Sequence, residues 1–589
     1  MGYVARVMSM SDTPARAPTW PGYVALVVPF AIIVVRLASV SGHVYLPDDL
    51  ALIDLDVRGA MHFSQQLGPF DRFGWNHPGP VFFYLISIVA RVLGTGARAM
   101  YVSAALINLA SAIATVAVVR RRAGTRAALF ASVCCCGLAV ALSTTNPGAV
   151  TFSEGALGAV VSPWNPDVVI FPLLCFCVLA GSAAAGSPRS LLGAGLAATF
   201  VVQTNIATLP LVAVLALVAT VACLTGIVAD RRRLIRSDGR PRRPADRIGS
   251  IGGRRVPWSV VAAVVLLVAA WLPPVVQQLS GHPGNLTLIW RFFTERHTPL
   301  SLGIGLWSVL AVDAVFVSGL AQEMTFVLGA PHSHAWLVLA GVLLLGLVGA
   351  GLGLARRSRF AAALGAGSLI GLGTAIVSVT RVVGPVYGYL ILWAIVLPVV
   401  AAIGVGAAVL APAPSKARPA DHTPAHGRAP SRARALAGWL DPARARPSGR
   451  PATVVLGLLA LGAGAVLSLQ MVRQPSLQSA SDPNVAAAWK AVAAHLRPGP
   501  SGVFVGDAGT SIEGLFTFFG LVNELDSHGY SPRVSPFWRT QVGPRYVSDG
   551  REPVQVVLYP PSPAVRSMQG FVGQTQYADV VIIHSPPGP

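Results

Sequence analysis

Residues 21–40 have the sequence PGYVALVVPFAIIVVRLASV, an apolar run that contains one charged residue, Arg36. About 20 apolar residues in a helix cross the hydrocarbon core of a bilayer, which is about 30 Å thick. No cleavage site in a polar context follows, so we interpret this run as an uncleaved first transmembrane helix rather than a signal peptide. Ten more segments of spanning length lie near residues 98–119, 127–145, 165–183, 190–208, 210–228, 258–276, 335–354, 360–380, 386–409 and 453–470. The sequence therefore predicts a polytopic α-helical membrane protein with about eleven transmembrane helices.

The overall composition supports this fold class. Of the 589 residues, 53% are hydrophobic and only 12% are charged, whereas soluble domains carry about 25% charged residues. The mean hydropathy is +0.62. Glycine and proline are abundant, but the apolar runs are too long for a disordered or collagen-like chain. The composition thus excludes a soluble enzyme, a fibrous protein and a disordered protein.

The net charge of +20 comes mainly from arginines that lie in short blocks between the apolar segments. Such blocks are typical of cytoplasmic loops, and we do not expect the chain to bind nucleic acid. The blocks lie near residues 120–126, 229–257, 356–359 and 411–451. Eleven crossings place all of them in the cytoplasm, with the N-terminus inside and the C-terminus outside the plasma membrane. Two shorter apolar stretches, 79–94 and 300–320, would break this parity, so we expect interfacial or re-entrant helices there.

These assignments divide the chain into five parts. The expected order is a cytoplasmic N-terminus (1–20), a transmembrane domain (21–410) with outer loops at 41–97 and 277–334, a basic disordered linker (411–452), a last transmembrane helix (453–470) and an extracytoplasmic domain (471–589). The last part has an ordinary soluble composition. Two helices (486–496 and 512–526) and three apolar strands (502–506, 554–558 and 579–583) predict a small α/β domain.

The sequence offers no convincing metal site. All six cysteines lie inside apolar segments, where free cysteine behaves as a small hydrophobic residue. Glu323, His332 and His334 are scattered rather than set at a ligand spacing. We predict neither a bound metal nor a cofactor, and a dependence on a divalent cation stays open.

Acidic residues are concentrated in the first outer loop, directly after the first transmembrane helix. The segment 46–56 is LPDDLALIDLD, in which Asp49, Ile53 and Asp56 share one helical face. The intervening apolar residues indicate a helix that is partly buried at the membrane surface. A carboxylate held there has a raised pKa and can act as a general base. The alternative interpretation is a solvated acidic loop.

This loop carries a family resemblance. The acidic pair Asp48-Asp49, followed by His77-Pro78-Gly79-Pro80 before an aromatic stretch, resembles the GT-C superfamily of integral-membrane glycosyltransferases. The similarity is to the bacterial branch related to protein O-mannosyltransferases and aminoarabinose transferases, in which a His-Pro-Pro-Leu stretch follows the acid; here Gly79 replaces a proline. The segments 271–278 and 283–286 also resemble actinobacterial members. The resemblance covers residues 20–410.

The resemblance implies a reaction and candidate residues for it. The superfamily's catalytic acid falls on Asp48 or Asp49, and Asp54 is the competing candidate. The implied donor is a polyprenyl-phosphate sugar, and the implied product forms on an acceptor hydroxyl at the outer face, in cell-envelope or cell-wall biogenesis. The implied partners are the lipid-linked donor, a glycan, lipid or protein acceptor, and membrane lipids.

The leaving phosphate of such a donor needs positive charge, which the fork of an arginine supplies well. The candidates for this role are Arg381, Arg291, Arg296, Arg72 and His77. Arg381 could instead be a helix-end residue that reaches the interface, Arg291 and Arg296 could pair with Glu295, and His77 could cap or pack a turn. We expect Tyr387, Trp75 and Asn76 to contact the substrate.

Three other functions compete with a glycosyltransferase. A transporter or flippase is the main alternative, although its usual midplane charges and repeated halves are not evident in this sequence. A polysaccharide ligase or polymerase would depend on a large outer loop with Arg and His, and a receptor or scaffold would use the C-terminal domain as its binding module. The sequence does not specify the sugar, the acceptor, the stereochemical outcome, the oligomeric state or the role of the C-terminal domain.

Overall fold

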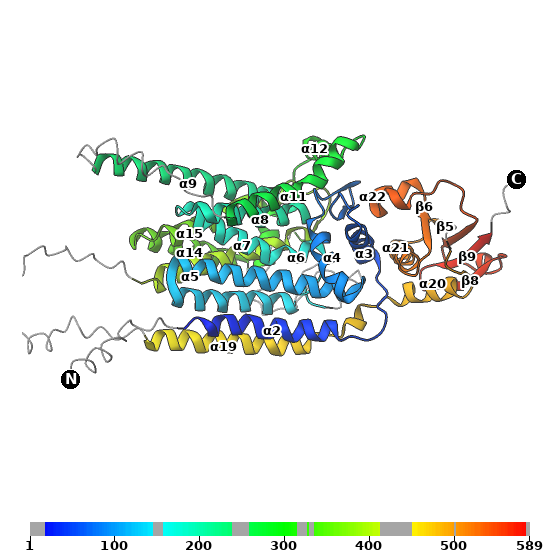
Figure 1. The fold of residues 1–589 in the computed structure, drawn as a ribbon, viewed down its shortest axis with the longest axis horizontal. Helices are drawn as coiled ribbons and strands as arrows, with labels where there is room; N and C mark the ends of the chain where they lie inside the picture. Colours follow the sequence, from blue (N-terminus) through cyan, green and yellow to red (C-terminus); the bar gives the residue numbers. More distant parts are fainter. Residues whose placement is uncertain are drawn as a thin grey trace, which may run out of the picture.

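The computed structural model describes residues 18–144, 157–237, 258–314, 327–328, 335–412, 450–499 and 502–584. Residues 413–449 of the predicted linker 411–452 and residues 238–257 of the Arg block at 229–257 lie outside these residues. The described chain forms a bundle of long helices with a small α/β domain at one end (Figure 1). Among the described residues, nine helices are long and apolar enough to cross a membrane. The predicted fold class, a polytopic helical protein with a C-terminal α/β domain, is confirmed.

Each of the eleven expected segments lies in a helix, although two of them are not separate members of the nine. The helix α5 (Ala97–Thr144) has 48 residues and consists of two helices joined at Gly124. Gly124 has φ 86°, a left-handed conformation that glycine adopts without strain. The helix α8 (Pro188–Thr204) has only 17 residues. The other spanning helices are α2 (Trp20–Ala38), α7 (Ile170–Ala184, which continues the short helix α6 at Asn165–Val168), α9 (Leu209–Ser237), α11 (Trp258–Ser280), α14 (Ala335–Ala355), α15 (Arg359–Val379), α17 (Val396–Leu410, which continues the short helices α16 at Gly388–Ile391 and η4 at Leu392–Ile395) and α19 (Arg450–Arg473).

Basic turns between the helices gather at the end of the bundle opposite the C-terminal domain. The Arg122 side chain donates a hydrogen bond to the carbonyl oxygen of Ala185 at 2.8 Å. The Arg126 Nε donates to the Thr453 hydroxyl at 3.1 Å, and Arg356 donates to carbonyl oxygens at the end of α17. The turns that the sequence places on one side of the membrane therefore lie together at one end.

The first and last transmembrane helices pack side by side along the bundle (Figure 1). A Cβ on Gly464 of α19 would lie 2.6 Å from the Cα of Ala25 in α2, so the close approach needs glycine. The Arg36 side chain joins the ends of the two helices, donating a hydrogen bond to the carbonyl oxygen of Gln474 at 2.9 Å. The entry to the first outer loop and the entry to the C-terminal domain are therefore held together.

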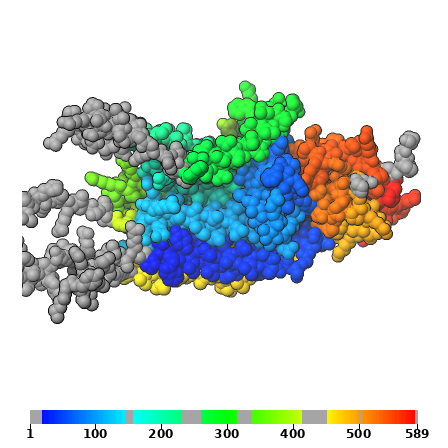
Figure 2. Space-filling view, viewed as in Figure 1, coloured from blue at the N-terminus to red at the C-terminus, as the bar shows by residue number. Residues whose placement is uncertain are grey.

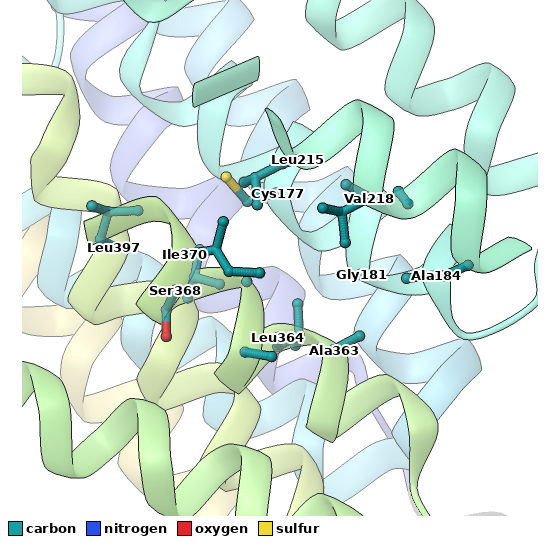
Figure 3. Close-up of a pocket in the computed structure, with 16 residues that line it drawn as sticks. Cys177, Gly181, Ala184, Leu215, Val218, Ala363, Leu364, Ser368, Ile370 and Leu397 are labelled. Atoms are coloured by element: carbon teal, nitrogen blue, oxygen red, sulfur yellow. The ribbon is translucent and has the colours of Figure 1, made fainter. Parts of the chain in front are cut away.

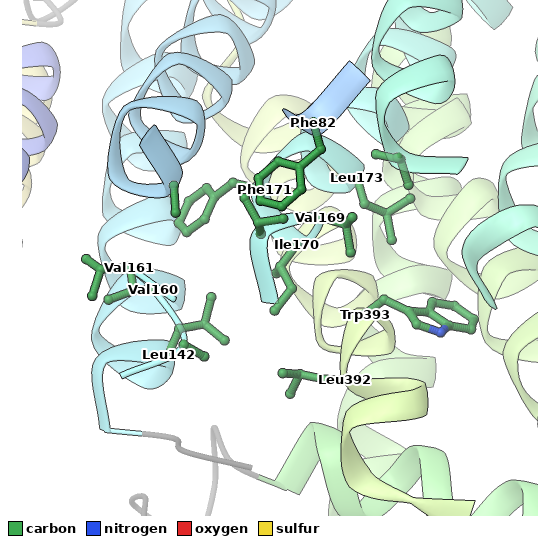
Figure 4. Close-up of a cluster of buried hydrophobic side chains, with 14 of the residues drawn as sticks. Phe82, Leu142, Val160, Val161, Val169, Ile170, Phe171, Leu173, Leu392 and Trp393 are labelled. Carbon is green, nitrogen blue, oxygen red and sulfur yellow. The ribbon is translucent and has the colours of Figure 1, made fainter. Parts of the chain in front are cut away.

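The interior of the bundle is a continuous apolar core. Phe82, Phe171 and Trp393 are among its largest fully buried side chains, and they come from segments far apart in the sequence (Figure 4). Burial of aromatic side chains of this size contributes strongly to packing.

Short elements collect at the end of the bundle that carries the C-terminal domain, which we call the α3 end. They are the helices α3 (Asp48–Met61), α4 (Val81–Leu93), α12 (Asn285–Thr294) and α13 (Leu302–Asp313). With 13 and 12 residues, α4 and α13 reach only about 20 Å at 1.5 Å per residue. Within the described residues, both are too short to cross a bilayer core of about 30 Å. This agrees with the interfacial or re-entrant helix expected at 79–94, whereas residues 315–320 of the stretch 300–320 lie outside the described residues.

Two small antiparallel pairs complete the α3 end. One joins β1 (Phe70–Asp71) to β2 (Trp75–Asn76) in a hairpin. The other joins β3 (Val327–Leu328) to β4 (Val386–Tyr387). The second pair brings the outer loop before α14 to the segment that follows α15.

The C-terminal domain is a five-stranded sheet with the strand order β6-β5-β7-β9-β8. The pairs β5–β6 and β5–β7 are parallel, and β9 is antiparallel to both of its neighbours. The predicted helices and strands are confirmed as α20 (Pro483–Ala493), α21 (Ile512–Ser527), β5 (Gly502–Asp507), β7 (Val554–Tyr559) and β9 (Asp579–His584). The sequence analysis missed β6 (Ser531–Val534) and β8 (Phe571–Gln574). Figure 2 shows this domain seated on the α3 end of the bundle.

The eleven-crossing arrangement predicts that the C-terminal domain and the Arg122 turn lie on opposite sides of the membrane. We expect an impermeant maleimide to label Gln569→Cys, an exposed position of the domain, in intact cells. Arg121→Cys should be labelled only after permeabilisation, and the wild-type chain reports any reaction of the native cysteines. Labelling of Gln569→Cys only after permeabilisation would overturn the topology.

Candidate functional site

The helix α3 begins directly after Pro47 and places two carboxylates in its first turn. Its apolar residues Leu50, Ile53 and Leu55 are buried, so the helix is set into the α3 end rather than lying free on it. Asp48 and Asp49 are half-buried. Asp48 has φ 42°, a left-handed conformation that aspartate tolerates better than most residues. The helix therefore forms where the sequence predicted it, as a partly buried element.

Asp49 is fixed by an aromatic residue from a distant loop. The Trp164 indole N–H donates a hydrogen bond to Oδ2 of Asp49 at 2.9 Å. Burial raises the pKa of the Asp49 carboxyl, while the hydrogen bond from Trp164 acts in the opposite direction. A carboxylate with a raised pKa that still ionises is suited to accept a proton.

Trp164 connects Asp49 to a pair of tyrosines. Its ring lies 4.9 Å from the ring of Tyr389, measured between centroids. The rings of Tyr389 and Tyr387 are stacked at 5.7 Å with an interplanar angle of 6°. Tyr387 is the last residue of β4, and Tyr389 lies two residues later in the segment that leads into α17.

Arg72 completes this cluster from the β1–β2 hairpin. Its guanidinium lies 4.9 Å from the centroid of Phe73 and 5.1 Å from that of Tyr387, so both aromatic rings hold it by cation–π contacts. It also donates hydrogen bonds to the Tyr389 hydroxyl at 3.5 Å and to the carbonyl oxygen of Val383 at 3.3 Å. The guanidinium of Arg72 is exposed to solvent, while its ring contacts and hydrogen bonds fix its position.

A second carboxylate, Asp71, belongs to the same cluster. Burial raises its pKa to about 6, and the nearby Asp49 carboxylate adds to this shift while Arg72 opposes it. Asp71 lies in the first outer loop but was not among the residues predicted for the site. Its direct attachment to Arg72 was the one local signal that could have indicated it. We call Asp49, Asp71, Arg72, Trp164, Tyr387 and Tyr389 the Asp49 cluster.

Asp54 does not belong to the Asp49 cluster. It is buried, its Oδ2 is paired with the Arg58 guanidinium, and its Oδ1 accepts a hydrogen bond from the Gly96 backbone N–H at 2.7 Å. Both oxygens are therefore engaged in holding the fold. This arrangement contradicts the candidacy of Asp54 as the base, because a base must keep an oxygen available to its substrate.

His77 is a buried packing residue rather than a ligand for phosphate. The Ile206 backbone N–H donates to its Nδ1 at 3.1 Å. The amide of Asn165 lies 2.9 Å from Nε2. Burial lowers the pKa of His77 to about 3, so the ring is neutral at ordinary pH and cannot supply the positive charge that was expected of it.

Trp75 and Asn76 are also buried, which contradicts their expected contact with substrate. Trp75 packs against the rings of His77 and Phe292. Asn76 exchanges hydrogen bonds with Asn285, its N–H donating at 2.9 Å and its carbonyl oxygen accepting at 2.7 Å. Of the three predicted substrate contacts, only Tyr387 lies in the Asp49 cluster.

The other predicted phosphate ligands lie outside the Asp49 cluster. All three are exposed. Arg291 lies in the last turn of α12 and Arg296 just beyond the end of that helix. Arg381 lies just beyond the end of α15. Arg381 is two residues from Val383, whose carbonyl oxygen accepts from Arg72. Only Arg72 is therefore joined to the predicted base by described contacts.

Within the described ranges, no group of three His, Cys, Asp or Glu side chains is placed to hold a metal ion. Glu323, His332 and His334 lie outside the described residues. The cavity drawn in Figure 3 lies among α7, α9, α15 and α17, and none of its lining residues belongs to the Asp49 cluster. Its lining, which includes Cys177, Leu215, Leu364 and Ser368, contains no charged side chain, so it is unsuited to proton transfer.

Comparisons with known proteins give a fold likeness only. No family model matches the chain, and no curated protein matches it. The structure is similar to ArnT from Cupriavidus metallidurans bound to undecaprenyl phosphate, with 16% sequence identity, a TM-score of 0.48, and coverage of 100% of this chain and 99% of that chain. It is also similar to the archaeal oligosaccharyltransferase AglB from Archaeoglobus fulgidus, in complex with an inhibitory peptide and a dolichol-phosphate, with 13% identity, a TM-score of 0.36, and coverage of 91% and 69%. Both neighbours are membrane glycosyltransferases of the superfamily that the sequence motifs resemble.

Proposed function

We propose that the protein is a membrane glycosyltransferase of the GT-C type, which transfers a sugar from a polyprenyl-phosphate donor to an acceptor hydroxyl at the outer face of the membrane. The observation that carries this proposal is the Asp49 cluster, in which a carboxylate of raised pKa and a fixed, exposed arginine share one aromatic framework. A base for the acceptor and a cation for the leaving phosphate are the two groups that this reaction requires. The similar structure of ArnT is bound to undecaprenyl phosphate, a lipid of the donor class proposed here.

Each group of the cluster has a role in the proposed reaction. Asp49 accepts the proton of the acceptor hydroxyl, whose oxygen forms a bond to the anomeric carbon. The bond from that carbon to the phosphate oxygen breaks, and the polyprenyl phosphate leaves with the electron pair. Arg72 stabilises the charge that develops on the phosphate, and the faces of Tyr387 and Tyr389 provide a surface for the sugar. Asp71, which has a pKa of about 6 and lies beside Arg72, strengthens the negative field around the base.

The position of the cluster favours transfer at one side of the membrane. It lies at the α3 end, opposite the basic turns around Arg122. Under the positive-inside rule we expect those turns in the cytoplasm and the cluster on the outer side. No nucleotide is needed there, because a lipid-phosphate donor brings its own activated bond.

The direct experiment incubates the purified protein with a panel of radiolabelled polyprenyl-phosphate sugars and membrane extracts that contain acceptors. Release of polyprenyl phosphate together with labelled product supports the proposal. Movement of an intact lipid-linked sugar across vesicles without cleavage would instead identify a flippase, the main alternative from the sequence.

Replacing Asp49 by Asn should abolish transfer while the protein stays folded and binds donor. The change removes the proton-accepting oxygen, and loss of a general base typically costs about 10²–10⁴-fold in rate. Asp48→Asn is the matched control and should have a milder effect, because Asn replaces Asp well at a helix start. Turnover and donor binding are measured for both variants, which separates loss of the base from loss of the fold. Near-normal turnover of Asp49→Asn would contradict the assignment of the base.

Replacing Arg72 by Gln should weaken donor binding by about 10- to 100-fold. A hydrogen bond to a charged group contributes about 1.5–3 kcal/mol, and 1.4 kcal/mol corresponds to a factor of ten in affinity. Arg381→Gln removes a charge at a nearby exposed position and serves as the comparison. Affinity is measured with polyprenyl phosphate in detergent. A larger loss in Arg381→Gln than in Arg72→Gln would move the phosphate site to Arg381.

Replacing Trp164 by Phe should shift the acid limb of the pH–rate profile towards higher pH. The ring is kept, but the N–H that lowers the pKa of Asp49 is lost, so Asp49 ionises only at a higher pH. Tyr389→Phe removes a hydroxyl that contacts Arg72 rather than Asp49, so its acid limb should stay in place. An unchanged limb in Trp164→Phe would show that the limb does not report Asp49.

A further inference from the structure

Two opposite faces of the helix α3 make different contacts. Asp49, which the proposed function uses as the base, lies at its start, and Arg58 lies nine residues later on the opposite face, because successive residues of a helix are rotated by about 100°. The rise of about 1.5 Å per residue separates the two Cα atoms by about 13 Å along the axis. Arg58 is therefore not placed to contact the reacting atoms.

The C-terminal domain packs against the Arg58 face through its helix α21. A Cβ on Gly520 of α21 would lie 2.8 Å from the carbonyl oxygen of Leu46, so the domain touches the backbone that leads into α3. The backbone N–H of Asp482 donates to the carbonyl oxygen of Tyr45 at 2.9 Å. His43 and Glu524 are joined across the same interface, with Nε2 and Oε2 separated by 2.7 Å.

Arg58 joins three elements at the centre of this interface. Its Nη1 donates to Oδ2 of Asp526 at 2.8 Å, and its Nη2 donates to Oδ1 of Asn523 at 2.9 Å, both on α21. Its Nη2 also pairs with Asp54. The second oxygen of Asp54 accepts from the Gly96 N–H, at the beginning of α5. The side chains of Arg58 and Asp54 are only 12% and 2% exposed, so solvent does not compete strongly for these bonds.

The start of α3 has weaker local support. No side-chain hydrogen bond caps it, because its N-cap residue is Pro47. A helix of 14 residues is near the length at which isolated helices are marginal in water. The position of Asp49 therefore depends both on its hydrogen bond from Trp164 and on the contacts that fix the rest of the helix.

We propose that Arg58 is a positioning residue through which the C-terminal domain sets the place of Asp49, so that the domain is part of the catalytic unit. This inference rests on the proposed function for its effect on rate. A misplacement of a catalytic group by about 1 Å can cost about 10²-fold in rate, even where the misplaced group keeps its chemistry.

The test uses the full-length protein and variants on both sides of the interface. Asp526→Asn weakens the ion pair between Arg58 and the C-terminal domain but leaves Arg58 and Asp54 paired. We therefore expect this variant to fold even if Arg58→Gln does not. Arg58→Lys keeps the charge but loses the fork. Arg551→Gln, an exposed arginine of the same domain whose side chain makes no described contact with α3, is the matched control.

We expect Arg58→Gln to lower kcat by about 10- to 100-fold, with the KM for donor changed by less than about twofold. Arg58→Lys should recover part of the loss, and Asp526→Asn should lower kcat in the same direction. Hydrogen exchange in the peptide that spans residues 48–61 should become faster in Arg58→Gln and Asp526→Asn and stay unchanged in Arg551→Gln. An equal loss in kcat and donor affinity would indicate general damage rather than positioning and would overturn the inference.

Hydrogen exchange separates this inference from the proposed function. If the wild-type protein turns over no donor in the panel, the proposed function fails, while faster exchange of α3 in Asp526→Asn still demonstrates the coupling. If the wild-type protein is active but exchange and kcat are unchanged in both Asp526→Asn and Arg58→Gln, the coupling is wrong and the proposed function stands.

Discussion

A hydrocarbon layer cannot solvate an unpaired peptide group, and the architecture of this protein depends on that constraint. Each long apolar segment satisfies its backbone hydrogen bonds within a helix, and the charged side chains are displaced to the two ends of the bundle. At one end, Arg122 and Arg126 bond to carbonyl and hydroxyl oxygens of neighbouring turns. At the α3 end, carboxylates, aromatic rings and Arg72 meet in the Asp49 cluster. The separation of these two ends is what gives the protein a chemically distinct face.

Most of the fold could be predicted because its signals are local. Spanning length and apolar composition located the helices of the bundle, including the two that merge at Gly124, because a break in hydropathy marks each turn. In the C-terminal domain, the buried strands β5, β7 and β9 have continuous apolar runs. The missed strands β6 and β8 have four residues each, and β6 contains Pro532. Both lie at the edges of the sheet, where partial exposure removes the apolar pattern.

The site was predictable only in part, for a physical reason. The acidic pair identified the correct helix, since carboxylates beside a buried apolar face are visible in the sequence. The partner of Asp49 is Trp164, which comes from a loop more than a hundred residues later, and no spacing rule connects them. Asp54 was misleading because its pairing with Arg58 and Gly96 depends on how α3 and α5 pack. His77 and Asn76 lie in a segment with several polar residues, which suggested an exposed loop, but both side chains are buried in the fold.

The packing of α2 against α19 has a consequence for how the protein is made. Ribosomes deliver the N-terminal helix first, so α2 enters the bilayer long before the helix that will cover its Ala25 side. Until α19 arrives, lipid must occupy that face, and α3 lacks the domain against which it rests in the finished molecule. The nascent chain can therefore complete all of its other crossings before the Asp49 cluster gains its final support. Under the proposed function, activity would therefore begin only after the last helix and the C-terminal domain have been made.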